Sequence, residues 1–173
     1  MSALEFSRII RLKSIQSDPQ NFTASTEECA ALAERFEIEG IANLRTEVKF
    51  ELAGTKVLVS GLLMADVVQA CAISGEVFPH RISEALGFVF VPAEQTANEE
   101  LEIELRSGDL DEIEYDGDSF DLGEAIAQSL GLAIDPYAEG PNADAARKAA
   151  GITSDDAPIG QLAEALKELK RTN

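Results

Sequence analysis

A two-residue periodicity over residues 43–52 constrains the fold of this chain more than any other feature. One set of alternate positions is mostly apolar, and the other is charged: Leu44, Thr46, Val48, Phe50 and Leu52 against Arg45, Glu47, Lys49 and Glu51. Successive side chains of a β-strand point to opposite faces, so the pattern predicts a strand with one buried and one wet face. Residues 53–55 then allow a tight reversal, and the more apolar run 56–70 is predicted to pair with the first strand as a hairpin.

A third strand is predicted over residues 77–91, after a turn at residues 74–76. Strands this long usually curl or bulge, and Gly61 and Gly87 are candidate bend sites. The predicted fold class is therefore α+β, an antiparallel β-meander flanked by helices. A barrel-like curvature is compatible with this pattern.

The remaining elements are predicted from helical periodicity and capping signals. Residues 5–12 are interpreted as a strand, and residues 26–36 as a helix with one apolar face. Asp121 can cap a helix over residues 122–133, and Gly151 can end a short helix over 143–150. An amphipathic helix is predicted over 158–170. Between residues 92 and 120 we expect an acidic loop together with an edge strand, with one short alternating piece at 101–105. Ile113 and Tyr115 belong to an acidic alternating segment that leads to the helix start at Asp121. One domain over 1–137, with a helical tail over 138–173 packed on it, is the simplest organisation.

Composition and charge narrow the classes of function. The 173 residues, 45% of them hydrophobic, suffice for one compact core. Residues 1–81 hold 8 Lys/Arg against 11 Asp/Glu, a net charge of −3, whereas residues 82–173 hold 6 against 21, a net charge of −15. Such a chain repels a polyanion at long range unless its basic residues gather on one surface. No long apolar run or signal pattern is visible, so we expect a cytoplasmic protein that does not enter a membrane.

Two segments carry a family resemblance: CAISGEVFPHRISEALGFVFVP, residues 71–92, and DLDEIEYDGDSFDLGEAIAQSLGLAIDPY, residues 109–137. They resemble the YceD family, the large ribosomal RNA subunit accumulation proteins, in its alphaproteobacterial form. The likeness covers roughly residues 57–151, and its motif residues are Cys71, Gly75, Asp121, Leu122 and Gly123. Ser74 stands where many family members have a second cysteine. The resemblance implies a non-enzymatic factor that supports accumulation or maturation of large-subunit ribosomal RNA, with ribosomal RNA or ribosomal and assembly proteins as its partners.

The acidic segment 99–118 is the candidate surface for a basic ribosomal protein or assembly partner. The candidate partner-binding residues are Asp109, Asp111, Glu112, Glu114, Asp116, Asp118 and Asp121, together with Pro136 and Tyr137 at the helix exit. The alternative role for the carboxylates is to form a solvated acidic surface that keeps the protein soluble. For Pro136 and Tyr137 the alternative is that they stop the helix and pack onto the sheet.

Two other functions remain open from the residues alone. Direct RNA binding requires Arg45, Lys49, Lys56 and Arg81 to converge on one face, where neighbouring acids would dilute them. A metal-dependent hydrolase requires the loop carboxylates to meet in a cleft, yet their spacing lacks the glycine and the closing glutamate of a calcium loop.

No motif in the sequence indicates catalysis. His80, the single histidine, has no nucleophile elbow near it, and no glycine-rich phosphate loop is present. Neither Cys29 nor Cys71 belongs to a CxxC or zinc-type cluster, and Cys71 has no nearby Lys or Arg in sequence to lower its pKa. We therefore expect no enzymatic activity, no cofactor, no metal site and no small-molecule substrate.

Overall fold

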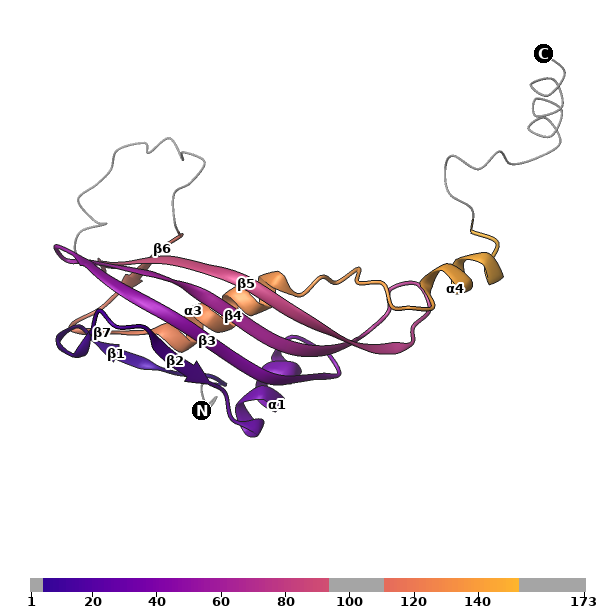
Figure 1. The fold of residues 1–173 in the computed structure, drawn as a ribbon, viewed down its shortest axis with the longest axis horizontal. Helices are drawn as coiled ribbons and strands as arrows, with labels where there is room; N and C mark the ends of the chain where they lie inside the picture. The colour runs from indigo at the N-terminus through magenta and orange to yellow at the C-terminus, as the bar shows by residue number, and fades with distance from the viewer. Residues whose placement is uncertain (1–4, 94–110, 153–173) are drawn as a thin grey trace, which may run out of the picture.

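Three long antiparallel strands form the centre of the molecule. The structure, a computed structural model, describes residues 5–93 and 111–152. Strands β3 (Gly40–Ala53), β4 (Lys56–Ala70) and β5 (Val77–Pro92) follow one another in a five-stranded sheet of order β2-β3-β4-β5-β6. The predicted meander and the α+β class are confirmed (Figure 1).

The sheet is extended on both sides by shorter strands. β2 (Gln20–Thr23) pairs antiparallel with β3, and β6 (Asp111–Tyr115) pairs parallel with β5. A second, two-stranded sheet joins β1 (Ile9–Arg11) to β7 (Ser119–Asp121), and a 3-10 helix, η1 (Leu12–Ser14), follows β1. Among the described residues the large sheet is open, with β2 and β6 at its ends, and it does not close into a barrel.

Two segments differ from the sequence expectations in part. The loop with an edge strand expected over residues 92–120 contains β6 at the edge of the sheet and the start of β7, and the strand expected over 5–12 is shorter, Ile9–Arg11. β7 pairs with β1, more than 100 residues earlier in the chain, and local periodicity does not reveal such pairing. The alternating piece at residues 101–105 lies outside the described residues.

The helices begin and end close to their predicted bounds. They are α1 (Thr26–Arg35), α3 (Leu122–Ala133) and α4 (Ala143–Ala149). α1 is capped by Ser25, one residue before the expected start, since the Ser25 hydroxyl accepts from Glu28 N and the Glu28 carboxylate accepts from Ser25 N. This is a capping box. The helix predicted over 158–170 lies outside the described residues, and no described helix has the length and apolar character needed to cross a membrane.

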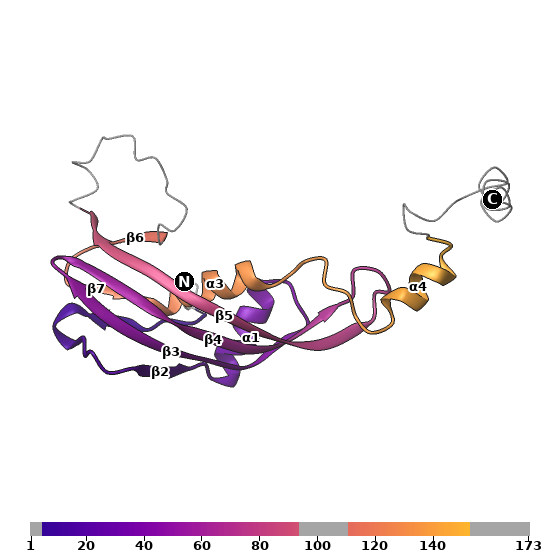
Figure 2. The ribbon, with the colours of Figure 1, turned by 45° about the horizontal axis from the view of Figure 1, so that its top comes forward.

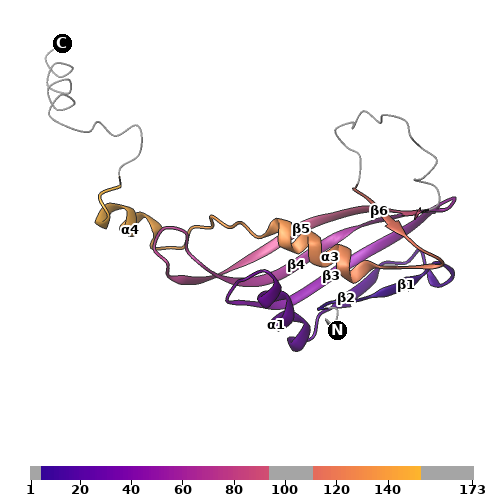
Figure 3. The same cartoon turned by 180° about the vertical axis from the view of Figure 1, so that it is seen from behind.

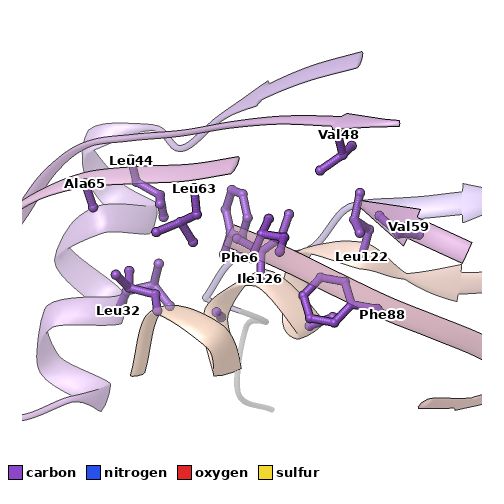
Figure 4. Packing of buried hydrophobic residues seen from close by; sticks show 14 of the residues in the cluster. Phe6, Leu32, Leu44, Val48, Val59, Leu63, Ala65, Phe88, Leu122 and Ile126 are labelled. Carbon is purple, nitrogen blue, oxygen red and sulfur yellow. The ribbon is translucent and has the colours of Figure 1, made fainter. Parts of the chain in front are cut away.

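Among the residues that the structure describes, helices cover one face of the sheet and no element covers the other. α3 lies across the sheet, as Figures 1 and 3 show from opposite sides, and Leu32 of α1 and Ile126 of α3 join the same core as Leu44 and Leu63 (Figure 4). The predicted alternation of β3 is confirmed except at Leu52, which is exposed at the hairpin end. The inner face therefore forms the core, and the charged side chains lie on the outer face.

The register irregularity of β3 does not lie at either of the expected bend sites, Gly61 and Gly87. The register shifts between Ala42 and Arg45, and Asn43 there has φ 53°, a left-handed conformation. Gly61 pairs with Val48 without a register shift, but a Cβ on Gly61 would lie 2.3 Å from Glu47 O. Gly61 is needed because the β3 backbone approaches it closely, which is the other usual reason for a glycine inside a strand.

Candidate partner-binding surface

Part of the predicted acidic segment is a strand followed by a turn. In β6, Ile113 is half-buried and Tyr115 is buried, whereas Glu112 and Glu114 are exposed. The Tyr115 hydroxyl donates to Thr55 O at 2.9 Å, which ties β6 to the hairpin between β3 and β4. Alternation thus buries the apolar side chains and leaves the acidic ones in solvent.

The turn after β6 carries the other exposed acids. Asp116, Gly117 and Asp118 are exposed, and Gly117 has φ 73°, a conformation that favours glycine. Directly beyond the turn, the Phe120 ring stacks on Phe90 with centroids 4.0 Å apart. We call Glu112, Glu114, Asp116 and Asp118 the acidic strand-turn, a set of carboxylates on a fixed backbone.

Not all of these carboxylates are equally available. Glu112 forms a salt bridge of 2.9 Å with Lys56, and the side chains of both residues are almost half exposed. For Asp111 only the backbone is described, and Asp109 lies outside the described residues. Glu114, Asp116 and Asp118 are therefore the described acids on which a partner-binding role best rests.

Asp121 has a different role, because its carboxylate is occupied within the chain. It accepts from the backbone N–H of Gly123 at 2.9 Å and of Glu124 at 3.4 Å, and so caps α3. It also accepts from the Ser7 hydroxyl at 2.6 Å and from Arg8 N at 2.8 Å. Asp121 therefore joins the N-terminal segment to the start of α3.

The two residues after Asp121 serve the same junction. Leu122 is fully buried, and its N–H donates to Arg8 O at 3.0 Å. A Cβ on Gly123 would lie 2.6 Å from Phe6 O, so only glycine lets the two backbones pass this closely. The Asp-Leu-Gly motif of the resemblance thus has a structural explanation in this chain.

Cys71 and Gly75 belong to the turn between β4 and β5. Gly75 N donates to Cys71 O at 2.9 Å, and Gly75 has φ 72°. Hydrogen bonds from Ser74 first, then from Gly140, lower the pKa of the Cys71 thiol to about 7. The sequence missed this shift, since it arises from hydrogen bonds and not from a basic neighbour. The thiol is nevertheless only 3% exposed, so solvent reaches it poorly.

The same turn holds the chain that leaves α3. Ala72 N donates to Ala138 O at 3.0 Å, the Gln69 amide donates to Asp135 O at 2.7 Å, and the Asn142 amide donates to Glu76 Oε2 at 2.7 Å. These contacts bring residues 135–142 to the β4–β5 end of the sheet. Two motifs of the resemblance that are far apart in sequence, the Cys71 turn and the Asp135-Pro136-Tyr137 turn, therefore lie near each other.

Pro136 and Tyr137 are exposed. Asp135 Oδ1 accepts from Tyr137 N at 2.8 Å, and Tyr137 is 78% exposed. The alternative that these residues pack onto the sheet is therefore wrong. They also lie apart from the acidic strand-turn, because the 12 residues of α3, about 18 Å of helix, separate the two regions (Figure 1).

The candidate RNA-binding residues share one face but do not form a free basic patch. Alternation and register place Arg45, Lys49, Lys56 and Arg81 on the outer face of the sheet. Arg81 Nε pairs with Asp66 Oδ1 at 2.7 Å, and the Arg81 hydrogen bond is the main cause that lowers the pKa of Asp66. Lys56 is paired with Glu112. The face is therefore mixed in charge, which disfavours binding to a phosphate backbone.

The geometry needed for metal-assisted hydrolysis is not found in the described ranges. Within residues 5–93 and 111–152, no three His, Cys, Asp or Glu side chains gather closely enough to hold a metal ion. His80 lies in β5, where its ring stacks on Phe78 with centroids 5.5 Å apart.

Comparisons with protein-family models, with curated proteins and with solved structures found no match to this chain.

Proposed function

We propose that this chain is a cytoplasmic, non-enzymatic factor that supports the accumulation or maturation of large-subunit ribosomal RNA, and that it acts by binding a basic ribosomal or assembly protein. The observation that carries the binding mechanism is the acidic strand-turn, in which Glu114, Asp116 and Asp118 are exposed on a backbone fixed by a buried aromatic cluster. A pre-ordered surface loses little conformational entropy on binding. The ribosomal assignment itself rests on the YceD resemblance of residues 57–151.

The choice of a protein partner over RNA rests on charge. The half of the chain that contains the acidic strand-turn has a net charge of −15, and two of the four candidate RNA-binding cations are paired with carboxylates. Long-range attraction therefore favours a cationic partner, with an association rate that falls as salt rises.

Crosslinking in cells, followed by identification of bound proteins and bound RNA, tests this function. A variant with Glu114→Gln, Asp116→Asn and Asp118→Asn should recover less basic ribosomal or assembly protein than the unmodified chain. A control variant removes the same number of exposed acids elsewhere, at Glu34, Glu39 and Glu51, and should recover as much. Equal recovery by both variants, or RNA as the main crosslinked species, contradicts the binding mechanism. Normal large-subunit RNA after deletion of the gene contradicts the assignment as a whole.

A further inference from the structure

The outer edge of β5 is only partly covered. β6 pairs with it from Phe88 to Pro92. Among the residues that the structure describes, no strand pairs with that edge over residues 77–87. Figures 1 and 2 show β5 at the margin of the sheet with β6 beside one end only. An uncovered strand edge presents N–H and C=O groups that can pair with another chain.

Two residues limit how this edge can be used. Pro79 has no N–H, so pairing is restricted to about residues 80–87. By register Glu84 lies opposite Leu63 on the inner face of the sheet, yet it is exposed. A charge on the inner face of an edge strand discourages pairing with a second copy of the same chain, and the net charge of −18 on each copy adds to the repulsion.

A groove beside the edge can accept side chains of an added strand. Its volume is about 270 Å³, and its walls come from β5 and α3: Glu84, Ala85, Gly87 and Phe88 of β5, and Ser129, Leu132 and Ala133 of α3. Leu132 is 87% exposed, which is unusual for a leucine on a helix that packs against a core. The groove thus combines apolar side chains with one carboxylate, from Glu84, and one hydroxyl, from Ser129.

We propose that residues 80–87 of β5 form a docking edge for an extended, basic segment of a partner protein, which adds to the sheet as a further strand. Backbone hydrogen bonds supply affinity in this mode, and alternate side chains supply specificity. Side chains on the inner side of the added strand enter the groove, where a Lys or Arg meets Glu84. The neighbouring strand β6 exposes Glu112 and Glu114 along the same border, which favours the same charge. This inference goes beyond the proposed function. It requires that the partner supplies an extended, positively charged segment, and that segment need not come from a ribosomal protein.

Amide hydrogen exchange on the full chain, followed by NMR, tests the docking edge. The probe is a blocked eight-residue peptide that alternates valine with lysine. Two control peptides replace the lysines with glutamate or two of the valines with proline. We expect the valine-lysine peptide to slow exchange of amides within residues 80–87, and both controls to leave them unchanged, because the first reverses the charge and the second cannot complete the hydrogen-bonded ladder.

A matched pair of charge variants locates the contact. Glu84→Lys should weaken binding of the valine-lysine peptide about threefold or more. Glu47→Lys makes the same charge change at an exposed position of β3 and should alter binding less. Amides of residues 80–87 that donate to β4 are protected in the free chain, so only those that point away from β4 report on the edge. The proposal is overturned if these outward-pointing amides are already protected without peptide, which would mean that this chain or a second copy covers the edge. Protection confined to other residues, or equal effects of the two variants, also overturns it. The peptide assay does not depend on ribosomal partners, so its failure is distinct from failure of the proposed function.

Discussion

Replacing Asp121 with alanine tests the junction on which the fold depends most. The change removes the cap of α3 and the two hydrogen bonds that hold Ser7 and Arg8. Loss of an N-cap costs about 1 kcal/mol, and hydrogen bonds to a charged acceptor contribute about 1.5–3 kcal/mol each in favourable settings. Because the carboxylate is only partly buried, we expect the free energy of unfolding to fall by about 3 kcal/mol.

Urea unfolding followed by far-UV circular dichroism measures this loss. If the free energy of unfolding falls by about 2 kcal/mol for each 1 M of urea, the urea midpoint should fall by about 1.5 M. Asp116→Ala removes an exposed carboxylate five positions earlier and should change stability by less than about 0.5 kcal/mol. The stability of Asp121→Asn should lie between the stabilities of these two variants, since asparagine is an equally good N-cap but carries no charge.

Two outcomes would refute this reasoning. If Asp121→Ala costs no more than Asp116→Ala, the carboxylate does not tie the N-terminal segment to α3. If Ser7→Ala and Asp121→Ala are strictly additive in the double variant, the hydrogen bond between them carries no energy, because residues that share a network are expected to couple.

Three further outcomes follow from the same structure. Gly123→Ala should destabilise the protein by about 1–3 kcal/mol in urea unfolding, because its methyl group would lie 2.6 Å from the carbonyl oxygen of the crossing N-terminal segment; an unchanged midpoint would contradict the close approach. Ser74→Ala should raise the pKa of the Cys71 thiol above its value of about 7, measured as the pH dependence of alkylation at that cysteine by mass spectrometry; an unaltered profile would assign the shift to other groups. The pKa of Glu28 is lowered chiefly by its hydrogen bond from Arg8, so its contribution to stability is present above the ordinary value of 4.5 and is lost as pH falls through the folded value. The free energy of unfolding of Glu28→Gln should therefore depend less on pH in that acidic range. A plot of this free energy against pH with the same slope as that of the unmodified chain would contradict this.

The parts of the fold that follow from local periodicity could be predicted from the sequence. β3, β4 and β5 alternate over enough residues that their faces, pairing and turns are specified together. α3 was also predictable, since Asp121 precedes an apolar stripe at helical spacing. In each case the signal lies within the segment that forms the element.

The parts that were missed depend on contacts between distant segments. β6 joins β5 in parallel, and β7 pairs with β1, more than 100 residues earlier, so no local pattern reveals either partner. The register shift lies at Asn43, which adopts a left-handed conformation, whereas the sequence offered glycines as the more obvious bend sites. The lowered pKa of Cys71 likewise needs Gly140, which a distant part of the chain brings to the thiol.

The candidate site shows how much sequence order can mislead about function. Residues 109–137 look like one acidic, partner-facing run, but the fold gives its described residues separate roles. Asp121 is used for capping, Glu112 is paired with Lys56, and Tyr137 lies beyond α3 from the acidic strand-turn. A partner that contacts both ends must span about 18 Å, the length of α3. Tyr137→Ala and the triple change at Glu114, Asp116 and Asp118 should therefore act additively on partner binding if they belong to separate contacts, and a strong non-additive effect in a titration would instead place them in one interface.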